Sequence, residues 1–210
     1  MGRNEYSGMK KQSAGGNFFS GVPEIHHANR SRWVVRFAGW LFTHCGWKLI
    51  GEITAERKMV LVVGPHTSNW DFVIAITAML ALDIQLHWLG KHTLFRKPFT
   101  SLMKNLGGIP VNRSRAEGFA EQTAEHIRNA DTLILAITPE GTRSKVARLK
   151  TGFSRIARET PCPILPVTFD YARKEIRLFP LFAATDDSEG DAASVRDIFA
   201  TATAKHPAKF

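Results

Sequence analysis

The sequence has few cysteines, no metal-binding pattern and no apolar run long enough to cross a bilayer. Its two cysteines, Cys45 and Cys162, stand far apart in apolar surroundings, and their spacing matches no metal site. We therefore expect reduced thiols, a cytosolic setting and no bound metal. The best apolar run, residues 72–82, has 11 residues, whereas a membrane-spanning helix needs about 20.

Acidic residues are also scarce. The chain of 210 residues has 28 Lys and Arg against 19 Asp and Glu, which gives a net charge of +9 and a pI near 9.9. Such an excess suggests an anionic partner, which is a nucleic acid, an acidic membrane surface or a phosphorylated substrate. Because the cations are spread along the chain and no RNP, KH or zinc-finger signature is present, we expect no nucleic-acid partner.

The amino-terminal part of the chain divides into a polar tail and a basic, aromatic segment. Residues 1–30 show no hydrophobic periodicity and no apolar core of a secretory signal, so we expect a disordered tail. Residues 31–50 are expected to form an amphipathic helix. Its large side chains at helical spacing are Trp33, Phe37, Trp40, Leu41 and His44, and its cations are Arg30, Arg32, Arg36 and Lys48. This composition is typical of a helix in a membrane interface, and the alternative is a helix that packs its aromatic side chains on the domain.

Residues 51–210 alternate between short apolar runs and helical patterns. The expected strands are residues 59–63, 85–89, 109–111, 132–138, 164–169 and an edge strand at 175–179. The expected helices are residues 72–82, 98–105, 115–129, 151–159 and 192–204. Strands separated by helices predict an α/β fold, a single domain whose largely parallel sheet is flanked by helices on both faces. Such sheets bind ligands beyond the carboxyl ends of their strands.

His66 and Asp71 form the first candidate pair, at a predicted turn from strand to helix. An imidazole that takes a hydroxyl proton through one nitrogen needs its other N–H oriented, and a carboxylate supplies that contact. The alternative is a loop histidine whose neighbours only cap the helix. A second pair at the same spacing, His126 and Asp131, lies in a polar helical stretch, and we interpret His126 as a solvated residue.

Two further segments suggest an anion site. In Pro139-Glu140-Gly141-Thr142-Arg143-Ser144, the glycine permits a tight turn, Arg143 offers a planar fork for phosphate, and Thr142 and Ser144 add hydroxyl donors. In residues 107–113, Arg113 ends a short strand and is a second candidate cation. The alternatives are a surface turn and a solvated arginine. The Gly-x4-Gly-Lys pattern of a phosphate-binding Walker loop is absent.

In this order, these blocks resemble the glycerolipid acyltransferases, the family of 1-acylglycerol-3-phosphate (lysophosphatidate) acyltransferases. The blocks are residues 66–71, 107–113 and 139–144, followed by Ile164-Leu165-Pro166-Val167, and the resemblance covers residues 59–168. Pro65 is a departure, because family members often have Asn before the histidine. The resemblance implies that residues 51–210 form an acyltransferase domain.

The resemblance also implies a mechanism. The His66–Asp71 pair would deprotonate a lysolipid hydroxyl, which attacks the thioester of acyl-CoA or acyl-carrier protein without a covalent acyl-enzyme or any other cofactor. Glu140, Gly141, Thr142, Arg143 and Ser144, with Arg113, would bind the phosphate or head group, and Pro166 would shape the acyl site. The implied location is peripheral, on the cytoplasmic face of an anionic membrane. A thioesterase using the same base, and an acceptor such as lyso-ornithine lipid or lysophosphatidylglycerol, are the alternatives.

Overall fold

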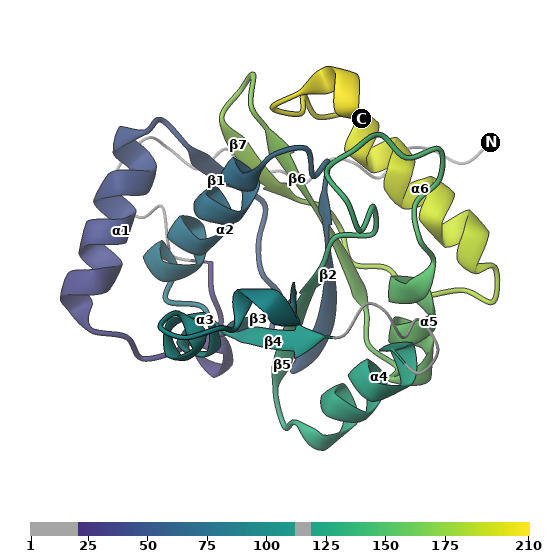
Figure 1. Cartoon of the computed structure of the whole chain (residues 1–210), viewed down its shortest axis with the longest axis horizontal. Helices are drawn as coiled ribbons and strands as arrows, with labels where there is room; N and C mark the ends of the chain where they lie inside the picture. The colour runs from purple at the N-terminus through teal and green to yellow at the C-terminus, as the bar shows by residue number, and fades with distance from the viewer. Residues whose placement is uncertain (1–20, 112–118) are drawn as a thin grey trace.

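A seven-stranded sheet in the order β1-β7-β6-β2-β5-β3-β4 runs through the middle of the molecule (Figure 1). The structure is a computed structural model and describes residues 21–111 and 119–210. The strands are β1 (Lys48–Ile50), β2 (Lys58–Gly64), β3 (Leu86–Lys91), β4 (Gly108–Val111), β5 (Leu133–Ile137), β6 (Ile164–Asp170) and β7 (Glu175–Leu178). Neighbouring strands are parallel except for β6 and β7. The predicted α/β fold with a largely parallel sheet is confirmed.

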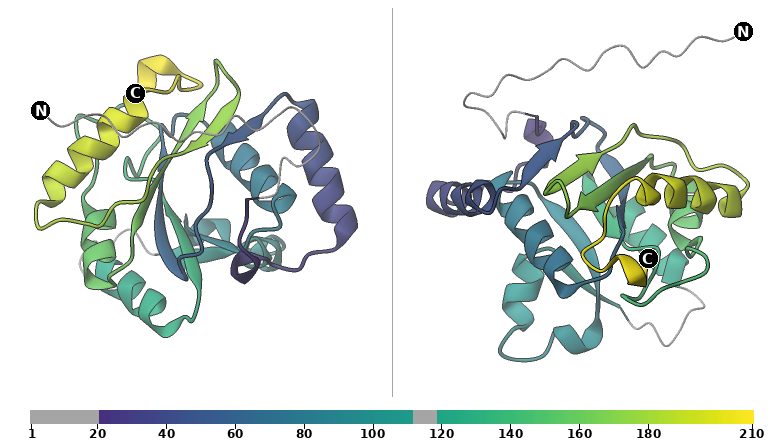
Figure 2. Two further views of the ribbon diagram at one scale, coloured as in Figure 1. Left: turned by 180° about the vertical axis from the view of Figure 1, so that it is seen from behind. Right: turned by 90° about the horizontal axis from the view of Figure 1, so that it is seen from above.

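Helices cover both faces of the sheet, as Figures 1 and 2 show. They are α1 (Arg32–His44), α2 (Asn69–Ala81), α3 (Thr100–Asn105), α4 (Phe119–Asn129), α5 (Gly152–Glu159) and α6 (Ser188–Ala200). Alternate residues of β2 point to opposite faces. Met59 and Leu61 pack in the core beneath α1 and α2, whereas Val60 and Val62 pack in the core beneath α4, α5 and α6. Since β2 lies between β5 and β6, its carboxyl end is in the middle of the sheet edge.

The amphipathic helix is shorter than predicted, and the sheet gains a strand. Helix α1 ends at His44, and Gly46 has a left-handed φ of +79°, which turns the chain into β1. Strand β1 pairs in parallel with β7 and forms the sheet edge. The prediction that residues 31–50 are all helical, and that residues 175–179 form the edge strand, is therefore wrong. The prediction ran too far because the pattern of aromatic residues continues to Trp47, past Gly46, where the helix has already ended.

Residues 21–30 are not a disordered tail. They contain a short 3-10 helix, Glu24–His26, and a bridge between His27 and Ile84. The amide of Arg30 donates a hydrogen bond to the Asp83 carboxylate at 3.0 Å. These contacts join the segment to the end of α2 in a way that its irregular sequence did not predict. The prediction for residues 1–20 lies outside the described residues.

The carboxyl-terminal helix begins earlier than predicted. Helix α6 starts at Ser188 rather than residue 192, because the Asp187 side chain accepts a hydrogen bond from the Gly190 amide and caps the helix. Helix α2 likewise begins at Asn69, because Ser68 caps it. Helix α4 is described from Phe119, so the start predicted at residue 115 lies outside the described residues.

Helix α1 exposes its aromatic side chains instead of packing them on the domain. Trp33, Phe37 and Trp40 are between 56% and 79% exposed, whereas the face against the protein consists of Ala38, Gly39 and Phe42. The alternative in which the aromatic residues join the core is therefore wrong for these three side chains. In the part of the chain that the structure describes, no helix is both long and apolar enough to span a membrane.

Candidate active site

The loop between β2 and α2 carries His66 at the carboxyl end of the central strand. Below it, Gly64 ends β2 directly under α6. A Cβ atom on Gly64 would lie 2.1 Å from Cε2 of Phe199, so no side chain fits there. The absence of a side chain on Gly64 thus permits α6 to pack against the end of β2, directly before the loop that carries His66.

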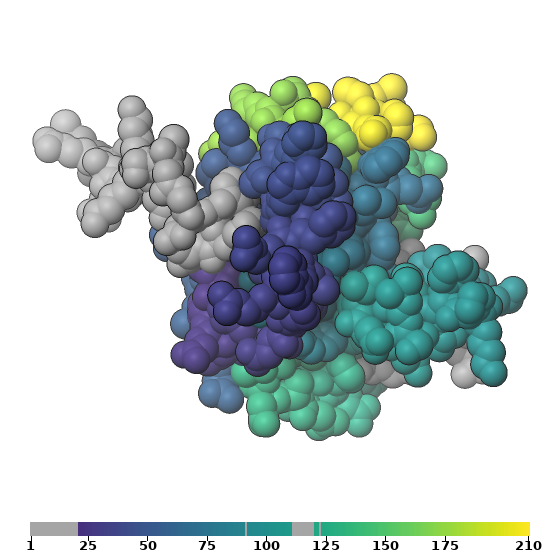
Figure 3. Space-filling view, turned by 90° about the vertical axis from the view of Figure 1, so that its left-hand side faces the viewer, coloured from purple at the N-terminus to yellow at the C-terminus, as the bar shows by residue number. Residues whose placement is uncertain are grey.

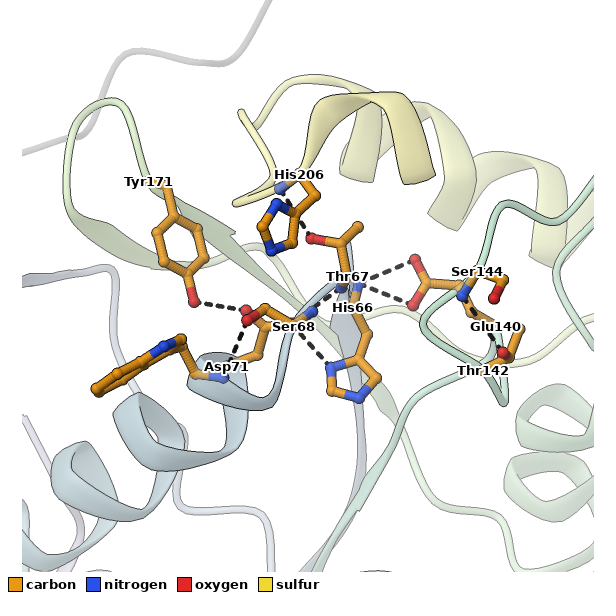
Figure 4. A network of polar contacts seen from close by, with 10 residues as sticks. His66, Thr67, Ser68, Asp71, Glu140, Thr142, Ser144, Tyr171 and His206 are labelled. Carbon is orange, nitrogen blue, oxygen red and sulfur yellow. Dashed lines mark hydrogen bonds and ion pairs between the residues drawn. The ribbon is translucent and has the colours of Figure 1, made fainter.

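Asp71 orients His66 and caps α2 at the same time. Its Oδ2 lies 3.0 Å from Nδ1 of His66 and accepts hydrogen bonds of 2.9 Å from the amides of Thr67 and Ser68 (Figure 4). The Ser68 hydroxyl in turn accepts a hydrogen bond from the Trp70 amide, which completes a capping box. The capping role and the orienting role, which the sequence presented as alternatives, are therefore combined in one carboxylate.

The carboxylate of Asp71 is buried but remains ionised. Its side chain is only 3% exposed. Burial acts to raise its pKa, but hydrogen bonds from His66, Tyr171 and the Ser68 amide outweigh burial and lower the pKa below its usual value. The contact between His66 and Asp71 is thus formed by an anion, as orientation of a neutral imidazole requires. The His66 side chain is 20% exposed, and its second nitrogen points away from Asp71 in Figure 4.

Tyr171 binds the other oxygen of Asp71, a contact that no local sequence pattern predicted. Its hydroxyl donates a 2.5 Å hydrogen bond to Oδ1 of Asp71, from a turn 100 residues away between β6 and β7. Burial and the neighbouring carboxylate raise the pKa of the Tyr171 hydroxyl, which keeps the phenol neutral and a donor. Trp47 packs edge-on against the Tyr171 ring at 5.2 Å and helps to hold it.

The carboxyl-terminal segment also contacts the His66 loop. The amide of His206 donates to Oγ1 of the buried Thr67 at 3.2 Å. Lys205 Nζ lies 4.9 Å from the centre of the Trp70 ring and 5.4 Å from that of Tyr171. Such contacts between distant segments leave no local pattern in the sequence. The only signal was the polar and cationic residues near the end of the chain, which indicate that this segment lies at the surface.

Glu140 holds the backbone of the His66 loop. Its side chain, only 4% exposed, points both oxygens at the amide of His66, at 3.0 and 2.8 Å. Burial raises the pKa of this carboxyl to about 7, although the bond from His66 acts in the opposite direction. The carboxylate thus binds the backbone of the His66 loop, and a contact of Glu140 with the head group stays a prediction. Pro65 lacks an N–H, and the first amide after it is the one that Glu140 binds.

The loop after β5 places Thr142, Arg143 and Ser144 at the same sheet edge as His66, since β5 and β2 are parallel neighbours. Gly141 has a left-handed φ of +66°, and its amide donates to the Thr138 carbonyl at 3.1 Å. The three residues after it are exposed. Within the described residues, Arg143 forms no hydrogen bond or ion pair. Arg113 lies outside the described residues.

Two other candidates lie apart from this group. Pro166 is buried in β6 opposite Val62 of β2, below the edge that carries His66. His126 is exposed on α4, as expected for a solvated residue. In residues 21–111 and 119–210, no three His, Cys, Asp or Glu side chains gather as they would around a metal ion.

Comparison with known proteins places the chain in a family. The family model Acyltransferase matches residues 47–170, more than half of the chain. A search of curated proteins finds no match. Among solved structures, the chain is similar to the 1-acyl-sn-glycerophosphate (LPA) acyltransferase PlsC from Thermotoga maritima, with a TM-score of 0.59 and 21% identity over 80% of this chain and 76% of that one. That likeness shows a shared fold. The family match includes His66, Asp71 and Glu140, and it shows that the chain belongs to the Acyltransferase family.

Proposed function

We propose that the protein is a membrane-associated O-acyltransferase that moves a fatty acyl group from an acyl thioester to a hydroxyl of a lysolipid. The supporting observation is the His66–Asp71 pair, in which a buried anion fixes the Nδ1 side of a partly exposed imidazole. Nε2 is then free to accept a proton. A lysophosphatidate such as 1-acylglycerol-3-phosphate is the acceptor class we favour.

In the proposed reaction, Nε2 of His66 takes the proton of the lysolipid hydroxyl as the oxygen attacks the thioester carbonyl. The C–O bond forms, the C–S bond breaks, and the protonated imidazole returns its proton to the departing thiolate. Asp71 stabilises the imidazolium that exists between these steps. No covalent acyl-enzyme is needed. The donor is acyl-CoA or acyl-carrier protein, which acts as a co-substrate.

The acceptor's anionic group is proposed to bind the exposed end of the loop after β5. Arg143 is suited to this role because it is exposed and has no counter-ion among the described residues, while Thr142 and Ser144 add hydroxyl donors. Arg113 is proposed as a second cation. Glu140 is proposed to keep the His66 amide in place, and Pro166 to shape the wall that meets the acyl chain.

Membrane association is proposed to occur through α1, on the cytoplasmic face. Its exposed Trp33, Phe37 and Trp40 lie on the same helix as the exposed Arg32 and Arg36. Aromatic side chains favour the interfacial region of a bilayer, and arginines favour its anionic head groups. Both substrates carry acyl chains, so an enzyme held on the bilayer meets them where they are concentrated.

The decisive test is an acyl-transfer assay with the purified full chain. Radiolabelled acyl-CoA and acyl-carrier protein are each offered with a panel of lysolipids. His66→Ala should abolish transfer, whereas the matched variant His126→Ala, which changes an exposed histidine at the same spacing from an aspartate, should remain active. Free fatty acid without acylated lipid would instead favour the thioesterase, in which water replaces the alcohol at the same base.

A further inference from the structure

The exposed large apolar side chains of the described residues are confined to three segments of one side of the protein. They lie in residues 25–40, at the start of α2 in residues 70–73, and in residues 94–102 around α3. Figure 3 looks at this side: α1 lies in the centre with α2 beside it, and the teal segment around α3 projects next to them. The segment around α3 is not part of the amphipathic helix, and the proposed function has given it no role.

The segment at residues 92–105 is held firmly while it exposes apolar side chains. The ring of Phe95 stacks on Trp88 at 6.0 Å, and Trp88 meets Phe72 of α2 edge-on at 4.8 Å. Gly108 lies so close beneath that a Cβ atom on it would be 2.9 Å from the Phe95 ring. Phe95 therefore anchors the segment and links it to α2.

The anchored segment turns other apolar side chains outward. Leu94, Phe99 and Leu102 are 50–59% exposed. Exposed apolar groups that are scattered singly need no explanation, but a cluster that continues from one element to the next marks an interaction site. Through Phe72, this cluster continues to the exposed apolar residues at the start of α2.

The charges on this side are almost all of one sign. The sequence has no Asp or Glu between Glu24 and Glu52, and none between Asp83 and Glu117. At the start of α2, the single carboxylate is that of Asp71, which is buried. The exposed cations of the segment around α3 are Arg96, Lys97 and Lys104. A surface that combines exposed apolar side chains with cations and no carboxylates is complementary to an anionic bilayer.

We propose that residues 92–105 form a second lipid-binding element, which acts together with α1 and the first turn of α2 to seat the protein on an anionic bilayer. This inference rests on the proposed function. A bilayer explains the surface better than an acidic carrier protein, because charge alone would not require Leu94, Phe99 and Leu102 to be exposed beside the cations. With this side against lipid, the start of α2 lies within the contact, so a lysolipid reaches His66 by lateral movement past Trp70.

The test measures partition of the full chain onto vesicles of phosphatidylcholine with and without phosphatidylglycerol. Leu94→Ser/Phe99→Ser/Leu102→Ser should lower partition onto the anionic vesicles by about tenfold or more, because the lost burial of three apolar side chains weakens interfacial binding. Arg96→Gln/Lys97→Gln/Lys104→Gln should reduce the preference for anionic over neutral vesicles. Its matched control, Arg128→Gln/Arg155→Gln/Arg158→Gln, removes the same charge from exposed positions on α4 and α5 and should bind as the wild type does.

The outcomes separate this inference from the proposed function. The apolar variant and the charge variant should both keep the wild-type circular dichroism spectrum. If the apolar variant misfolds, the partition of the charge variant decides the inference. A folded apolar variant with wild-type partition would overturn the inference. So would a charge variant that partitions onto vesicles as the wild type does but no longer binds acyl-carrier protein. If the wild type acylates no lysolipid, the proposed function fails, while the partition measurements still decide whether this surface binds lipid.

Discussion

Replacing Tyr171 with phenylalanine tests how the proposed base, His66, is controlled. The change removes one hydrogen bond, the 2.5 Å contact to Oδ1 of Asp71, and leaves the ring against Trp47 and beneath Lys205. A hydrogen bond to a charged group contributes about 1.5–3 kcal/mol. Asp71 keeps its hydrogen bonds from the amides of Thr67 and Ser68 and its contact with His66, so the fold and the geometry of the His66–Asp71 pair should survive.

The expected effect of Tyr171→Phe is on the pH dependence of the reaction. Without the phenol, the negative charge of Asp71 is less dispersed, and the carboxylate binds the protonated imidazole more tightly. The acidic limb of the profile of kcat/KM against pH should therefore move to higher pH by about one unit, which corresponds to about 1.4 kcal/mol, roughly half of the lost hydrogen bond. At pH values well below this limb's midpoint, kcat/KM should fall by about tenfold, whereas above it the rate should change little, and the KM of the acceptor should change little throughout.

Two further variants make this prediction refutable. Tyr171→Ala also removes the ring, so it should lose stability that Tyr171→Phe keeps. In an Asp71→Asn background, Tyr171→Phe should add little, because the charge that the phenol stabilises is already gone. If the pH profile of Tyr171→Phe superposes on that of the wild type, the contact plays no part in controlling the proposed base. A change confined to the KM of the acceptor would show a role in substrate binding instead.

Three other predictions concern Glu140, Gly64 and Arg143. Burial raises the pKa of Glu140 to about 7, so the folded protein keeps a proton that the unfolded chain releases, and this group makes stability fall as pH rises from about 4.5 to 7. Glu140→Gln, whose side chain can still accept a hydrogen bond from the His66 amide, should remove up to about 3 kcal/mol of that fall, measured by denaturant titrations at two pH values. An unchanged dependence of stability on pH would contradict the buried state of the carboxyl. Gly64→Ala should cost about 1–3 kcal/mol, because its Cβ would overlap Phe199, whereas Gly152→Ala, with nothing within 4 Å, should be tolerated. Arg143→Gln should raise the acceptor's KM about tenfold or more with little change in kcat, and unaltered acceptor kinetics would remove Arg143 from the anion site.

Local patterns in the chain were enough to predict the architecture and the pairing of His66 with Asp71. Apolar runs such as residues 59–63 and 164–169 match buried parallel strands, because their side chains must be apolar on both faces. His66 and Asp71 are five positions apart across one strand-to-helix turn, so a short-range argument could bring them together. The same turn chemistry placed cap residues at Ser68 and Asp71.

Contacts between distant segments were beyond such patterns. The carboxyl of Glu140 binds an amide 74 positions away, and the hydroxyl of Tyr171 reaches Asp71 across 100. Both contacts depend on β5, β2 and β6 being neighbours in the sheet, and a strand's own residues specify its faces but not its partners. For the same reason, the aromatic residues of α1 could be recognised as one helical face, but whether that face met the core or the solvent depended on which side of the helix the sheet came to occupy.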